Sequence, residues 1–131
     1  MREYLHFASE RQRDEWEDHR IPGIVRAAVF YIADARWSEL QAPTVVTSVW
    51  RSEAEERALG GKGVHLDFRA VDLDADEEVM QVEEAIRDRT NRFFPTGLSE
   101  MPRVAPLRHG TGPHFHVQAT KAEAKARGGV L

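Results

Sequence analysis

GVHLDFRAVDLD, at residues 63–74, is the segment from which the chemistry of this chain is best predicted, and HGTGPHFHVQ at residues 109–118 is its counterpart. The first segment places the imidazole of His65 seven positions before the carboxylate of Asp72, and the second contains further imidazoles. Imidazole nitrogens and carboxylate oxygens are ligands that zinc prefers in proteins. We therefore predict that the two segments meet at one zinc ion.

The residues next to these histidines have the pattern of short β-strands, which we predict at 69–73 and 115–118. Side chains alternate along a strand, so His114 and His116 project to one face, about 7 Å apart along the chain. In an antiparallel sheet His116 would lie beside the strand that carries Asp72, and the loop that carries His65 could fold back toward both. Three protein ligands with a fourth position left to water form the catalytic type of zinc site.

Each of these residues also has an ordinary structural explanation. Asp72 lies in a region crowded with other aspartates and could be a turn or capping residue. His114 and His116 could be members of an exposed strand. The metal hypothesis therefore depends on the joint occurrence of these residues and not on any one of them.

Helices are predicted from periodicity and capping signals. Apolar residues recur at three-to-four spacing over 24–40, which predicts a buried helix. Ser9 followed by Gln12, and Ser52 followed by Glu55, are capping-box patterns for two short helices. Asp74 or Asp76 can cap a helix running to about residue 92, and a Lys/Ala/Glu-rich tail begins at residue 120. Val79, Val82, Ile86 and Arg89 fall on one face of the 76–92 helix.

Strands are predicted at 44–50, 69–73, 103–107 and 115–118, the last two paired as a hairpin across residues 109–113. A glycine-rich loop is predicted at 60–63. Helices and strands in this order predict an α+β fold. We expect a small, mainly antiparallel sheet flanked by helices, with the zinc site on one sheet face and the helices near 24–40 and 76–92 covering the opposite side.

Composition limits the classes of protein that are possible. A length of 131 residues favours a single domain over residues 1–131. The net charge of -4 disfavours nonspecific nucleic-acid binding. The absence of cysteine excludes disulfides and cysteine zinc sites, so histidine and carboxylate must hold any metal. No signal peptide or membrane-spanning run is visible, so we expect a protein that is cytoplasmic as synthesised and has no stable membrane insertion.

Three segments in order resemble the zinc DD-peptidase and Hedgehog superfamily. His65 through Asp72 is similar to its His-x-x-Gly-x-Ala-x-Asp signature, and PHFHV at 113–117 to its late Trp-His-x-His element. TSVWRS at 47–52 is similar to its Thr-Ser-Gly-Tyr-Arg-Ser stretch. The superfamily includes D-alanyl-D-alanine carboxypeptidases, dipeptidases of vancomycin resistance and phage L-alanyl-D-glutamate endolysins. The resemblance covers roughly residues 44–118.

The resemblance implies a role for particular residues. It implies that His65, Asp72 and His116 bind zinc, although the pattern also permits His114 as the third ligand. Arg51 would face the scissile carbonyl and stabilise its developing negative charge. His114 would lie beside the metal as a proton-transfer or substrate-orienting group.

The chain departs from the family pattern at two kinds of position. Phe68 replaces the signature glycine, so we expect the loop to take a different path or to pack the Phe68 ring outward. Many members of the family have a glutamate three positions before the late histidine ligand, where it acts as general base; Pro113 stands there in this chain. The remaining candidates for this base are His114, which we favour, then His109, and Glu100 as a distant third.

The leading functional hypothesis is a zinc peptidase that cuts a peptide bond of the peptidoglycan stem peptide, of the D-Ala-D-Ala carboxypeptidase or the L-Ala-D-Glu endopeptidase type. Such a protein would resemble a phage or prophage lysin that reaches the cell wall after membrane permeabilisation, or a protein carried on a particle. The alternative is a catalytically silent zinc-stabilised binding or virion-structural module with the same fold, favoured by the missing glutamate. A third possibility is a metal-free α+β domain with chance histidine spacing.

Overall fold

A mixed, mainly antiparallel sheet organises the chain. The computed structural model describes residues 3–50, 52–59, 65, 68–109 and 112–130. The strand order is β1-β2-β3-β5-β4; β1 and β2 are parallel, and the other neighbours are antiparallel. The strands are β1 Leu5–Phe7, β2 Thr44–Ser48, β3 Ala70–Asp74, β4 Arg108–His109 and β5 Gly112–Gln118. The α+β fold with a mainly antiparallel sheet is therefore confirmed.

The helices begin where the capping residues predict. Ser9 precedes α1, and Ser52 precedes α3 with a complete capping box through Glu55. Asp76 caps a single 3-10 turn, Glu77–Val79, which leads directly into α4. The helices are α1 Glu10–Trp16, α2 Gly23–Leu40, α3 Glu53–Ala58, α4 Met80–Phe93 and α5 Lys121–Val130. None of the helices in the described part of the chain combines the length and apolar character needed to cross a membrane.

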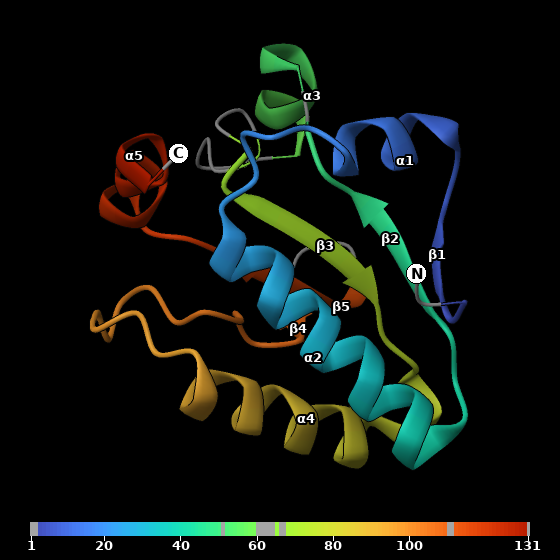
Figure 1. The fold of residues 1–131 in the computed structure, drawn as a ribbon. Helices are drawn as coiled ribbons and strands as arrows, with labels where there is room; N and C mark the ends of the chain where they lie inside the picture. The colour runs from blue at the N-terminus through green and yellow to red at the C-terminus, as the bar shows by residue number, and fades with distance from the viewer. Residues whose placement is uncertain (1–2, 51, 60–64, 66–67, 110–111, 131) are drawn as a thin grey trace.

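Helix α2 covers one face of the sheet, and α4 lies alongside it (Figure 1). Alternation along β3 and β5 sends Val71, Leu73, Phe115 and Val117 into a core shared with α2 residues such as Ile32. The intervening residues, including Asp72 and His116, therefore project to the face that α2 does not cover. This arrangement agrees with the expected position of the site on one sheet face.

A buried ion pair ties α2 to α4. The Arg36 guanidinium is 2% exposed and donates to the fully buried Glu83 carboxylate, with Nη2 2.9 Å from Oε2. Arg36 also donates to the Pro43 carbonyl and the Thr44 hydroxyl, and Glu83 accepts from the Asp76 backbone N–H. Two charges that would be costly to bury alone are thereby paired and hydrogen-bonded.

This ion pair helps to decide which face of α4 is buried. The sequence places Val79, Val82, Ile86 and Arg89 on one face, whereas the buried residues of the helix are Met80, Glu83, Ile86 and Thr90. Apolar periodicity treats a glutamate as a surface residue, so the partnership of Glu83 with Arg36 was invisible to it. The buried face is consequently rotated, with Ile86 common to both sets.

The segment predicted as a strand at 103–107 pairs with β5 as expected but is not a regular strand. Val104 forms an isolated bridge with Val117, the Ala105 N–H donates to the His116 carbonyl, and the Gln118 N–H donates to the Arg103 carbonyl. The regular strand that pairs with β5 is Arg108–His109. The backbone groups of Val104 bond side chains of α4 instead: its N–H donates to Asn91, and its carbonyl accepts from Asn91 and Arg87. The loop predicted at 60–63 lies outside the described residues.

Helix α5 is held to the sheet by a second ion pair, and this pair predicts an acid-sensitive contact. Arg103 donates to both carboxylate oxygens of Glu123, and these hydrogen bonds hold the pKa of Glu123 below its ordinary value, against an opposing effect of burial. A lowered pKa stabilises the fold above the unfolded-state pKa of about 4.3, and this contribution is lost as pH falls through the folded-state pKa. We expect the urea midpoint of wild type to be higher than that of Glu123→Gln at pH 7. The difference between the two midpoints should close below about pH 4. A gap that stays constant down to pH 3 would contradict this.

Candidate metal centre

His65 is buried with one nitrogen bonded and the other facing a carboxylate. The side chain is 1% exposed, and its Nδ1 lies 3.0 Å from the backbone carbonyl of Val49. A carbonyl only accepts, so Nδ1 carries a proton, and Nε2 is the nitrogen of this imidazole that could bind a metal. Nε2 has no hydrogen-bond partner among the described residues and lies 3.4 Å from Oδ2 of Asp72.

His116 is brought to Asp72 by strand pairing. The two residues are Cα partners in the antiparallel β3–β5 ladder, and Nδ1 of His116 lies 2.8 Å from Oδ1 of Asp72. Its Nε2 lies 3.0 Å from Oε1 of Gln118. The Gln118 amide nitrogen donates to the Pro102 carbonyl, which fixes the amide orientation and leaves its oxygen as the acceptor for His116.

The three side chains suit a single metal ion. One ligand atom from each of His65, Asp72 and His116 can be chosen so that all lie within 4.8 Å of one another. Ligand atoms of tetrahedral zinc are about 3.3 Å apart, from Zn–N bonds of about 2.0–2.1 Å. Nδ1 of His116 lies 2.8 Å from Oδ1 of Asp72, and Nε2 of His65 lies 3.4 Å from Oδ2, so each imidazole approaches a different oxygen of the carboxylate at a comparable distance. The donor set, the burial and the unpartnered Nε2 therefore fit a zinc ion.

Asp72 is held as a carboxylate. Burial acts to raise its pKa, but the hydrogen bond from His116 and the adjacent His65 imidazole outweigh burial and hold the pKa well below its ordinary value. A charged carboxylate between two imidazoles is the protonation state that a cation requires.

The other predicted site residues have different outcomes. Among the described residues, the group that could share an ion contains His116 and not His114. His114 lies two positions earlier on β5, pairs with Asp74 in the ladder, and has Nδ1 2.9 Å from the Gly112 carbonyl. Glu100 is exposed and accepts a hydrogen bond from Ser99. Arg51 and the side chain of His109 lie outside the described residues.

Phe68 contradicts one of the two alternatives expected for the missing glycine, the outward ring; the loop path lies largely outside the described residues. The Phe68 φ of 58° is in the left-handed region that favours glycine, so the backbone at this position keeps a glycine-like conformation. The ring does not pack outward. It is 5% exposed, stacks on Trp50 with ring centroids 6.2 Å apart, and lies under the Arg20 guanidinium. Packing on both ring faces offsets a backbone strain of about 1–3 kcal/mol.

Sequence reasoning missed the groups that orient the imidazoles. Gln118 lies two residues beyond His116, so strand alternation alone could have placed both on one face. The Val49 carbonyl carries no such signal, because any residue offers a backbone carbonyl. Partners of this kind fix the tautomer and the direction of metal-binding histidines.

Gln118 supplies a direct test of the centre. We expect Gln118→Leu to raise the zinc Kd by about 10–100-fold, because it removes the oxygen that accepts from Nε2 of His116 and so favours the tautomer that binds metal through Nδ1. Competition with a chromophoric chelator measures this value, and Gln81→Leu on the exposed side of α4 is the control. Equal zinc affinities for Gln118→Leu and wild type would contradict the role of Gln118.

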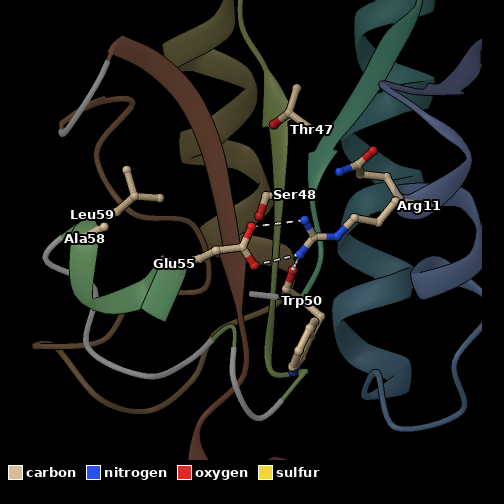
Figure 2. Close-up of a pocket in the computed structure, with 8 residues that line it drawn as sticks. Arg11, Thr47, Ser48, Trp50, Glu55, Ala58 and Leu59 are labelled. Atoms are coloured by element: carbon tan, nitrogen blue, oxygen red, sulfur yellow. Dashed lines mark hydrogen bonds and ion pairs between the residues drawn. The ribbon is translucent and has the colours of Figure 1, made fainter. Parts of the chain in front are cut away.

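A pocket of about 330 Å³ opens beside the metal-bearing part of the sheet (Figure 2). Its lining includes Thr47 and Ser48 of β2, and Ser48 is the Cα partner of Asp72. On the side of α1 the lining includes Arg11, which forms a two-pronged ion pair with Glu55 of α3. The pocket therefore lies one strand away from the metal group.

No family model matches the chain, and no match is found among curated proteins or solved structures.

Proposed function

We propose that this protein is a zinc-dependent peptidase that hydrolyses a peptide bond of the peptidoglycan stem peptide. The observation that carries the metal part of the proposal is the surroundings of the two imidazoles. All four nitrogens of His65 and His116 lie within 3.4 Å of an oxygen, and two of these oxygens belong to the Asp72 carboxylate. The Val49 and Gln118 oxygens can accept from the outer nitrogens of the two imidazoles, so that the inner nitrogens, which face Asp72 here, would turn their lone pairs to an ion bound between them.

Hydrolysis is the chemistry that this donor set favours. Three protein ligands leave a position open, as in catalytic rather than structural zinc sites. When bound, zinc supplies Lewis acidity, which polarises a carbonyl and makes water nucleophilic near neutral pH. The buried Asp72 keeps its negative charge at that point, and the Val49 and Gln118 oxygens favour the tautomers of His65 and His116 that bind metal through the inner nitrogens. The pocket bordered by Ser48 lies one strand away from the metal group and offers space for part of the substrate, although none of the three metal-group residues lines it.

Two further residues complete the proposal. His114 follows the same face of β5 as His116, at a distance of about 7 Å along the strand. We assign to His114 the transfer of a proton to the leaving amine. In the zinc DD-peptidase superfamily that the sequence resembles, a glutamate transfers this proton, and Pro113, which stands at that position here, cannot do so. Arg51, next to the pocket residue Trp50, is assigned the developing negative charge of the carbonyl. The ordered resemblance of residues 44–118 supports peptidoglycan peptides as the substrate class and a phage-type lysin as the setting.

Digestion of purified peptidoglycan tests this proposal. We expect zinc-loaded protein to release peptide fragments whose masses identify either a D-Ala-D-Ala or an L-Ala-D-Glu cleavage, and chelation to stop it. His114→Ala should keep one zinc per chain and lower the rate by about 10²–10⁴-fold. Zinc retention without cleavage by wild type would instead identify the silent zinc-stabilised module. A wild type that retains no zinc would reject both.

A further inference from the structure

A peptide group connects helix α1 to the candidate metal ligand His65. The carbonyl that accepts from Nδ1 of His65 belongs to Val49, at 3.0 Å. The N–H of the same peptide group belongs to Trp50 and donates to Oε1 of Glu15, at 3.2 Å. The Glu15 carboxylate, the Val49–Trp50 peptide and the His65 imidazole therefore form one hydrogen-bonded chain. Hydrogen bonds in such chains polarise one another, so a negative charge at the N–H end makes the carbonyl a stronger acceptor.

Arg11 holds this arrangement in place. Its Nε donates to Oε2 of Glu15 at 2.9 Å, and its Nη2 donates to the Trp50 carbonyl at 3.0 Å. The guanidinium also pairs with Glu55, whose Oε1 accepts from the Ser52 backbone N–H. Both sides of Trp50 are thus bonded to α1, and the segment that orients His65 has little freedom to shift.

The loop that carries His65 is fastened to the same segment at its other end. The backbone N–H of Phe68 donates to the His65 carbonyl at 3.3 Å, which closes a turn. The Phe68 ring stacks on the Trp50 ring, and Arg20 covers its other face at 4.1 Å from the ring centroid. The imidazole and the turn of His65 therefore share Trp50 as their anchor.

We propose that Glu15 is a positioning residue of the metal centre, which acts through the Val49–Trp50 peptide group to fix the tautomer and orientation of His65. The inference rests on the proposed zinc site but reaches beyond the segment of family resemblance, which begins at about residue 44. It assigns α1 to the support of the metal centre rather than to packing alone.

Two variants of Glu15 test this role through metal affinity. Glu15→Ala removes the acceptor of the Trp50 N–H, and we expect it to raise the zinc Kd by about tenfold, the lower end of outer-shell effects because one peptide group intervenes. Glu15→Gln keeps an acceptor oxygen and should recover part of the affinity. Asp14→Ala, an exposed carboxylate on the same helix, is the matched control and should bind as wild type does.

The second readout is the tautomer of His65, followed by ¹⁵N NMR of the imidazole in metal-free protein. We expect a proton on Nδ1 in wild type and in Glu15→Gln, and a mixture of tautomers in Glu15→Ala. An unchanged His65 tautomer in Glu15→Ala, together with an unchanged Kd where zinc binds, would overturn the proposal. If wild type binds no zinc, the proposed function fails, and the NMR comparison alone still decides the role of Glu15.

Discussion

Asp72→Ala is expected to abolish stoichiometric zinc binding and, with it, any hydrolysis. Asp72 lies between the inner nitrogens of both imidazoles and is the only carboxylate in the metal group of the described residues. Zinc binding of about 10–16 kcal/mol is shared by about four ligands. Loss of one ligand should therefore raise the Kd by roughly 100–1,000-fold. Equilibrium dialysis against buffered zinc measures the change directly.

Controls separate the loss of a ligand from the loss of any charge or imidazole. Asp88→Ala removes an exposed carboxylate on α4, and His6→Ala removes an exposed imidazole. Both should keep one zinc per chain with wild-type affinity. Asp72→Ala binding zinc as tightly as these controls would remove Asp72 from the site.

Glu83→Ala is expected to lower the free energy of unfolding by about 3–5 kcal/mol, because it removes the nearer and fully buried carboxylate of the Arg36 guanidinium and leaves only Asp74, with Oδ1 3.5 Å from Nη1. Glu83 accepts from Nε and Nη2 of Arg36 and from the Asp76 backbone N–H, so three hydrogen-bonding groups lose their acceptor together. The loss is comparable to much of the total stability of a small domain. Urea unfolding followed by circular dichroism measures it.

The comparison for this variant is an exposed pair of the same charges. Glu53 and Arg57 lie at i,i+4 on α3 with side chains 81% and 73% exposed. Glu53→Ala should cost less than about 0.5 kcal/mol, as exposed helix pairs do. A double variant with Arg36→Met and Glu83→Leu should be more stable than Glu83→Ala, since no unpaired charge stays buried. Similar costs for Glu83→Ala and Glu53→Ala would contradict the role of the buried pair.

The sequence predicted a helix or strand well where the signal lies within that element itself. The Ser52–Glu55 capping box, the apolar periodicity behind α2 and the branched residues of β2 each identified an element close to its observed bounds. Prediction was wrong where one segment's backbone or charge depends on another segment. Glu83 is buried because of Arg36 on a different helix. The backbone N–H of residue 104 donates to the α4 side chain of Asn91, so this segment forms only an isolated bridge with β5.

In the candidate site, too, features within one segment were predicted and contacts between segments were not. Alternation and spacing were enough to bring His116 to Asp72 and to suggest that His65 folds back to them. They could not identify the Val49 carbonyl or the Glu15 carboxylate, because these contacts depend on how α1 packs against the end of β2. Nor could they foresee that Phe68 would take the backbone conformation of the glycine it replaces, since the stabilising contacts come from Trp50 and Arg20.

Metal content of the purified protein tests the central claim most directly. After dialysis against zinc and then against metal-free buffer, we predict one zinc ion per chain in wild type and none in Asp72→Ala. Folded wild-type protein that retains no zinc would contradict the account.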